Sequence, residues 1–183
     1  MEKQKITAET VRADFNDLLA VVHYTRAAHE LGLWASERTL IERFFPDLKT
    51  PLLEAGCGAG RVSVALWQLG YRDITAFDFA EELLDQAVSL ATERRATGIR
   101  FLHADATNLT QCHLISDNNG ALPSEPTHLC HLISDIVPGA PGDRPNTCHL
   151  LRDISFGGAL FMFNGLMQIP GRKNRRAALR ELH

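Results

Sequence analysis

The feature that most constrains the fold of this chain is the glycine-rich run EAGCGAG at residues 54–60, which directly follows the short apolar stretch Pro51–Leu53. Apolar residues at helical spacing follow from Arg61 to Leu69 and stop at Gly70. A glycine loop between a strand and a helix lets the backbone approach a ligand closely. The run therefore predicts a βα unit with a ligand site at the carboxyl end of its strand.

Further strand and helix signals follow along the chain. Asp73–Asp78 and Ile99–His103 are short apolar runs, and between them Leu83–Ala91 has helical spacing. This alternation is typical of an α/β fold with a parallel sheet and flanking helices. Because the carboxyl ends of parallel strands meet at one edge of the sheet, we expect Asp78 and Asp105 to lie near the glycine loop.

The segment before the first strand is predicted to be helical. Apolar residues at helical spacing indicate one amphipathic helix from Thr7 to Leu33 with a break near Gly32. A second helix is expected to be capped by Ser36 and ended by Pro46.

The pattern changes after Asp105, because roughly fifty residues separate it from the next strand candidate, Gly158–Phe163, whereas connections in α/β domains are usually short. Proline and glycine are frequent in this stretch, so we expect an inserted loop over about residues 110–150 without regular structure. Asn119–Asn146 in particular is expected to be mobile and dispensable for ligand binding. A basic helix is expected from Arg172 onward.

Three repeats of Cys-His-Leu begin in the inserted stretch at Cys112, Cys130 and Cys148. Thiolate and imidazole are the usual zinc ligands, but structural zinc sites usually contain close C-x-x-C pairs. Neighbouring side chains in an extended segment also point to opposite faces. We therefore expect a duplicated short segment and no metal site.

Composition limits the remaining possibilities. At 183 residues and 45% hydrophobic, the chain is long enough for one sizeable core. Its net charge of -3, with both signs spread along the sequence, produces no field that would attract nucleic acid or an anionic membrane, so a small-molecule substrate is expected. The polar N-terminus predicts no signal peptide and no membrane span. We expect a cytoplasmic protein whose four cysteines are thiols.

Three motifs together resemble those of class I S-adenosylmethionine-dependent methyltransferases. The family's first motif, (Asp/Glu)-x-Gly-x-Gly-x-Gly, is matched throughout residues 54–60. An acidic residue at the end of the second strand, which binds the ribose hydroxyls in the family, is matched by Asp78, and Phe79 would lie beside the adenine. Asp105 matches the residue that accepts the adenine amino group. The cofactor-binding residues that the resemblance implies are Glu54, Ala55, Gly56, Cys57, Gly58, Gly60, Asp78, Phe79, Asp105 and Ala106.

The resemblance implies a Rossmann-like methyltransferase sheet that moves the sulfonium methyl of S-adenosyl-L-methionine to a small-molecule acceptor. Residues 1–49 would form an N-terminal helical lid and residues 50–183 the cofactor-binding domain. If a base is needed, His23, Tyr24 and Asn164 are the candidates. The family's strands five to seven have no counterpart here, so the sheet is expected to be incomplete. Gly158–Phe163 would be the fourth strand, and we expect self-association through its exposed edge.

Two alternatives remain beside an active methyltransferase. A nicotinamide oxidoreductase is disfavoured, because Arg61 stands where the third glycine of G-x-G-x-x-G belongs and Glu54 would repel a pyrophosphate. A truncated domain that binds the cofactor with little or no activity stays open.

Overall fold

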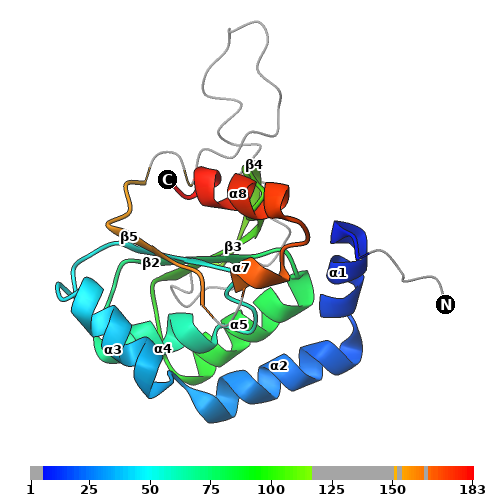
Figure 1. Cartoon of the computed structure of the whole chain (residues 1–183). Coiled ribbons are helices and arrows are strands. Elements are labelled where there is room, and N and C mark those ends of the chain that lie inside the picture. Colours follow the sequence, from blue (N-terminus) through cyan, green and yellow to red (C-terminus); the bar gives the residue numbers. More distant parts are fainter. Residues whose placement is uncertain (1–5, 117–150, 152–153, 163–164) are drawn as a thin grey trace, which may run out of the picture.

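The computed structural model describes residues 6–116, 151, 154–162 and 165–183 (Figure 1). The described strands form one sheet of five in the order β4-β3-β2-β1-β5. The strands β1, β2, β3 and β5 are parallel, and β4 runs antiparallel to β3. Their bounds are β1 Leu52–Ala55, β2 Ile74–Asp78, β3 Ile99–Asp105, β4 Asn108–Ser116 and β5 Gly158–Leu160. The α/β fold class with a mostly parallel, Rossmann-like sheet is thereby confirmed.

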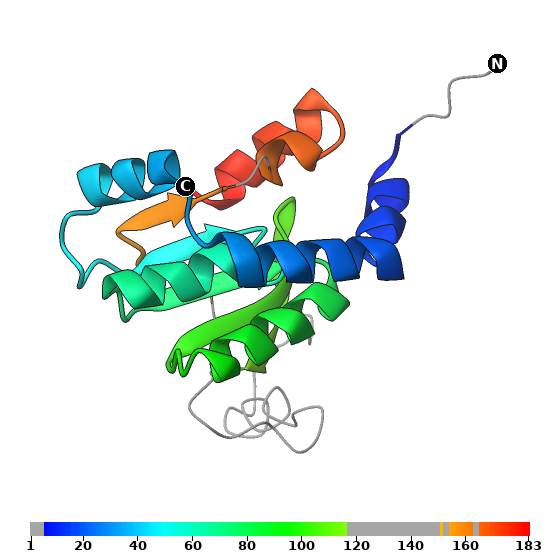
Figure 2. The same ribbon diagram turned by 90° about the horizontal axis from the view of Figure 1, so that it is seen from below.

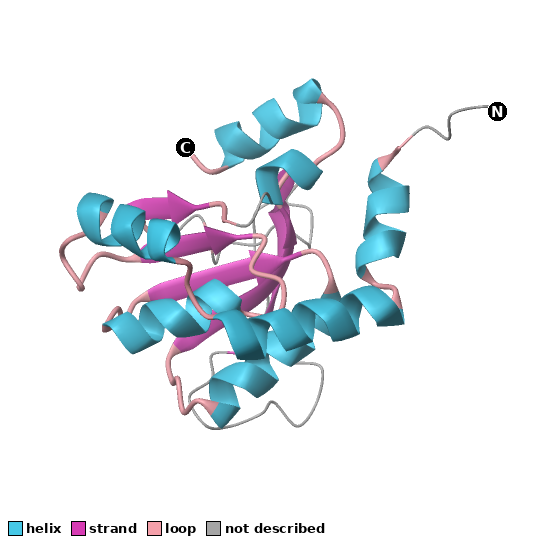
Figure 3. Cartoon of the chain, turned by 60° about the horizontal axis from the view of Figure 1, so that its bottom comes forward, coloured by secondary structure: helices cyan, strands magenta, loops and turns pink. Residues whose placement is uncertain are grey.

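Helices cover both faces of the sheet, as Figures 1 and 3 show. On one face α4 (Arg61–Leu69) and α5 (Glu81–Glu93) pack on the strands, and α2 (Leu18–Leu31) lies against both helices (Figure 2). On the other face α8 (Arg172–Glu181) packs against β4, after the short helix α7 (Gly165–Gln168). No described helix is long and apolar enough to cross a membrane.

The core follows from the alternation of side chains along each strand. On the side of α4 and α5, Ile74 and Phe101 are fully buried with the apolar stripes of those helices. On the opposite side, Phe77 and Leu102 pack in a second cluster with Leu182 from the chain end. Burial on both faces explains why these strands have nearly continuous apolar sequences.

The N-terminal helices differ in detail from the prediction. The expected single helix is two, α1 (Ala8–Phe15) and α2, because the Asp17 side chain accepts the Leu19 N–H (2.9 Å) and starts a new helix. The next helix, α3 (Ala35–Phe44), begins before Ser36, with Trp34 as its N-cap residue. The Glu37 carboxylate accepts the Trp34 N–H at 2.9 Å, so an acidic residue of the first turn replaces the expected serine cap.

The strand β4 is the largest departure from the prediction. Residues 110–116, expected to be irregular, belong to a strand that forms a hairpin with β3. Ala104 pairs with Cys112 and His103 with His113, so the first Cys-His repeat contributes one side chain to the core and one to the outer face. Cys112 is disulfide-bonded, contrary to the expected thiol. The later repeats at Cys130 and Cys148, and the span Asn119–Asn146, lie outside the described residues.

Candidate functional site

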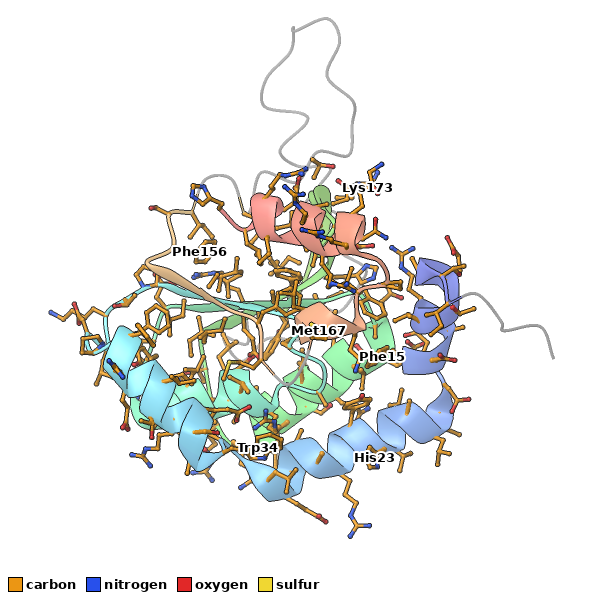
Figure 4. All side chains as sticks on the ribbon, viewed as in Figure 1. Phe15, His23, Trp34, Phe156, Met167 and Lys173 are labelled. Atoms are coloured by element: carbon orange, nitrogen blue, oxygen red, sulfur yellow. The ribbon has the colours of Figure 1, made fainter. Side chains whose placement is uncertain are left out.

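A cavity lies at the carboxyl ends of β1, β2 and β3, where the three sequence motifs meet. Its wall is completed by α1, by Tyr24 of α2, and by the segment that follows β5. In Figure 4, Phe15 of α1 lies on the inner side of that helix, facing the part of the molecule that carries Met167. The wall away from the motifs includes Ala8, Val11, Arg12, Phe15, Tyr24, Phe161, Met162, Gln168, Ile169, Pro170 and Asn174.

The glycine loop is held by hydrogen bonds within the protein. Gly56 and Cys57 both donate their N–H groups to the Phe77 carbonyl, at 2.8 and 3.0 Å, and Gly58 donates to an oxygen of Asp78 at 2.8 Å. The N–H of Gly60 reaches the Cys57 carbonyl at 3.0 Å. These four donors are therefore occupied, so the loop has fewer N–H groups to offer to a phosphate.

Asp78 ends β2 and is buried at the base of the cavity. Its second oxygen accepts the Ala80 N–H at 3.0 Å. Burial raises the pKa of this carboxyl, and the hydrogen bonds from Ala80 and Gly58 act in the opposite direction. A carboxylate has about four acceptor sites, so capacity remains for hydroxyl groups of a ligand.

Glu54 lies beside it, in the strand β1, and is 2% exposed. Ser63 of α4 donates its hydroxyl to the Glu54 carboxylate. Burial raises the pKa of Glu54 to about 8, against the lowering effects of Ser63 and Arg61. Among the described residues no lysine or arginine forms an ion pair with either Glu54 or Asp78. The described part of the cavity thus contains two buried acidic groups that no lysine or arginine contacts in an ion pair, although the charge of Arg61 acts on Glu54 and that of His103 on Asp78.

Arg61 is buried at the start of α4 and is turned toward α3. Its guanidinium makes two hydrogen bonds with the Glu37 carboxylate, both of 2.7 Å, and a third with the Gly32 carbonyl at 2.6 Å. It also lies over the Trp34 ring, 5.6 Å from the centroid. The residue that stands in place of a third glycine therefore joins the N-terminal helices to the glycine loop.

The helix α1 closes the cavity at the third motif. Arg12 forms an ion pair with Asp105, which also accepts the N–H and the hydroxyl of Thr107, at 2.8 and 2.7 Å. Burial alone would raise the pKa of Asp105, but the bonds from Thr107 and Arg12 bring it below the ordinary value. Phe15 stacks on Tyr24 (centroids 5.4 Å apart) and meets the Phe79 ring edge to face at 5.6 Å.

Eight of the ten predicted cofactor residues line the cavity, whereas Ala55, which is fully buried, and Gly60 are not part of its wall. Tyr24 also lines the cavity, whereas His23 is exposed on α2 and is not part of the wall (Figure 4). Asn164 lies outside the described residues.

Sequence reasoning missed the contributions of Arg12, Phe15 and the Glu37 partner of Arg61. No local pattern identifies them, because each meets its partner only through the fold. The described residues contain no group of His, Cys, Asp or Glu placed to hold a metal ion.

Part of this chain is similar to a known protein family. Residues 52–118 match a family model described as "Methyltransferase domain". The matched span runs from β1 through β4 and carries all three motifs. No curated protein matches the chain.

Several solved structures are similar to this chain. Magnesium protoporphyrin IX methyltransferase from Synechocystis PCC 6803, with bound S-adenosylmethionine, has 20% identity and a TM-score of 0.46 over 61% of this chain and 60% of its own. A putative S-adenosylmethionine-dependent methyltransferase from Methanococcus maripaludis has 19% identity and a TM-score of 0.45 over 59% and 47%. The [4+2]-cyclase SpnF has 17% identity and a TM-score of 0.46 over 57% and 44%. The matches thus cover at most 60% of the length of these three structures.

Proposed function

We propose that this chain binds S-adenosyl-L-methionine and transfers its sulfonium methyl group to a small-molecule acceptor. The observation that carries the proposal is the pair of buried acidic residues, Glu54 and Asp78, in one cavity at the carboxyl ends of neighbouring strands. An ionised carboxylate buried this deeply is costly, so Glu54 keeps its proton when no cation is near, and a cationic ligand would stabilise its ionised form. The methyltransferase-domain match over residues 52–118 supports the same reading.

The positions of the polar groups suggest how the ligand would be held. Asp78, fixed by Gly58 and Ala80, would accept the ribose hydroxyls. Phe79 and Asp105 would contact the adenine, and Glu54 would face the cationic end of the ligand. Each role uses groups that already line the cavity, and hydrogen bonds within the protein orient the three carboxylates.

When it is bound, S-adenosylmethionine supplies a methyl group attached to a good leaving group. The donor held by Asp78, Phe79 and Asp105 would supply this methyl group to a lone pair of the acceptor, with the thioether sulfur as the leaving group that keeps the electron pair. The protein's contribution is to hold the two reactants in line and exclude water. Phe15 and Tyr24 would form a wall against solvent. Burial raises the pKa of Tyr24, so its hydroxyl would orient the acceptor as a hydrogen-bond donor.

A nicotinamide dinucleotide fits the same cavity poorly. Four N–H groups of the glycine loop are occupied within the protein, and Arg61 is bonded to Glu37. Glu54 in its ionised form would also repel a pyrophosphate. We therefore favour the sulfonium ligand.

We also propose that two copies of the chain associate through β5. Among the described strands, β5 pairs with β1 alone, which leaves its other edge open. An open apolar edge is a ready surface for a further strand.

Calorimetry of the purified chain tests the proposed ligand. S-adenosylmethionine and S-adenosylhomocysteine should bind, and NAD should not. Asp78→Ala should weaken binding by about 1–3 kcal/mol, the scale of hydrogen bonds to a charged group. Asp73→Ala is the matched control, because Asp73 lies just before the other end of β2, where it pairs with Arg100. Binding of NAD alone, or equal affinities of the Asp78 variant and the native chain, would contradict the proposal.

Transfer of a labelled methyl group to candidate small molecules then separates an active enzyme from a domain that only binds the cofactor. Turnover that disappears in Asp78→Ala would support catalysis at this site. Tight binding without turnover for any acceptor would favour the binding domain.

A further inference from the structure

The ion pair of Glu37 with Arg61 affects the electrostatic field at the cavity. Both side chains are buried, and two parallel hydrogen bonds of 2.7 Å join them. The carboxylate is held from its own helix by the Trp34 N–H at 2.9 Å. Such a bidentate pair fixes the position of both charges.

Arg61 directly follows the glycine loop and lines the cavity beside Glu54. Its positive charge acts on Glu54, and the negative charge of Glu37 acts on Glu54 in the opposite sense. Glu37 therefore opposes the field that Arg61 exerts on the cavity. Without Glu37, the charge of Arg61 would act as the counter-charge of Glu54. A cationic ligand would then bind less tightly.

We propose that Glu37 is a specificity-determining residue that acts through Arg61: by neutralising this arginine it leaves Glu54 without a built-in counter-charge and makes the site prefer the sulfonium donor over the neutral thioether product. The inference rests on the proposed function. Donor and product differ by one methyl group and one positive charge, so the ratio of their affinities reports the charge of the site. Because the site is buried, the field of a single side chain is only weakly screened.

Other charged groups act on the remaining acidic residues of the cavity. His103 of β3 acts on Asp78 and has a ring nitrogen 3.0 Å from the Phe79 carbonyl, and its other nitrogen is 3.6 Å from Glu81. The pair of Arg12 with Asp105 lies at the adenine end of the cavity. Neither involves the pair of Glu37 with Arg61, so changes there leave these groups in place.

The test is the ratio of the dissociation constants of S-adenosylhomocysteine and S-adenosylmethionine, measured by calorimetry at one pH. Glu37→Gln should lower the preference for the sulfonium by about fivefold or more, as an uncancelled charge near the ligand would do. Arg61→Gln should raise the preference, because Glu37 then adds to the negative field. The double variant Glu37→Gln with Arg61→Gln should return to the native ratio, since the pair is neutral in both.

Glu42→Gln is the matched control, because Glu42 lies on the same helix in an exposed pair with Arg38 and should leave the ratio unchanged. Loss of one partner of a buried pair destabilises a fold. If Glu37→Gln does not fold, Arg61→Gln and the double variant decide. A ratio that stays native in every folded single variant, or a double variant shifted as far as a single one, would overturn the inference. Failure of the native chain to bind either ligand would instead refute the proposed function.

Discussion

At the scale of single residues, Glu54 has a strongly raised pKa. Its carboxyl is buried in β1 against the Ser63 hydroxyl, and burial raises its pKa from 4.5 to about 8. Without a cation beside it, Glu54 is therefore protonated near neutral pH. A cationic ligand would favour the ionised form, so its binding would be coupled to release of this proton.

The pH dependence of stability should reveal this proton. Between pH 4.5 and about 8 the folded chain keeps a proton on Glu54 that the unfolded chain releases. This group therefore makes its full contribution to stability below pH 4.5. The free energy of unfolding then falls as the pH rises from 4.5 toward 8. Glu54→Gln has no such proton, so the variant should gain stability relative to the native chain as the pH rises. Urea unfolding across this window measures the difference.

A second variant sharpens the same experiment. The Ser63 hydroxyl lowers the pKa of Glu54, so Ser63→Ala should extend the loss of stability to higher pH. Parallel pH profiles for the native chain and Glu54→Gln would show that Glu54 titrates alike in the folded and unfolded states. The coupling of ligand binding to proton release would then have no basis.

At the scale of elements, the contact of α4 with α5 depends on a glycine. Gly60 has a φ of +80°, and a Cβ atom there would lie 2.9 Å from the Ala87 Cβ of α5. The two helices can therefore come close only if this position has no side chain. This contact sets the distance between the helices that follow the first two motifs.

Two alanine substitutions separate backbone strain from steric contact. Gly98 has a similar φ of +78°, but a Cβ atom there would meet nothing within 4 Å. Gly98→Ala should lower the free energy of unfolding by about 1–2 kcal/mol through backbone strain alone. Gly60→Ala should cost a further 1–3 kcal/mol or so, because it also overpacks the interface with Ala87. Denaturant unfolding measures both, and equal losses would show that the helices move apart at little cost.

At the scale of the whole molecule, the N-terminal helices and the sheet share one core. Val21 and Ala28 of α2 and Ile41 of α3 are buried in the same cluster as Ile74 and Phe101 of the strands. Segments before the first strand thus contribute to the stability of the α/β domain as well as to the cavity wall. The division at residue 49 into an N-terminal lid and a cofactor-binding domain stays a prediction.

The proposed association through β5 is a property of the whole molecule. Sedimentation at increasing concentration should show a shift from monomer to dimer. Ala159 is exposed on β5, so Ala159→Lys should place a charge at the open edge and favour the monomer. A chain that stays monomeric at all concentrations would exclude the proposed pairing.

Local patterns in the sequence were sufficient for much of the fold and the site. The strands β1, β2 and β3, the helices α4 and α5, and the meeting of Glu54, Asp78 and Asp105 at one edge all follow from periodic burial and glycine spacing. These signals work because the period of apolar residues records which face of an element is buried. The topology of parallel strands then brings their carboxyl ends together.

Only the tertiary structure decided which distant groups meet. Part of the expected loop is the strand β4, because Leu109 and Cys112 are buried where this strand pairs with β3. Arg12 pairs with Asp105 across 93 positions, and Arg61 with Glu37 across 24. Periodicity reports that a side chain is buried or charged, but not which side chain will face it, because the partner is chosen by the packing of the whole chain.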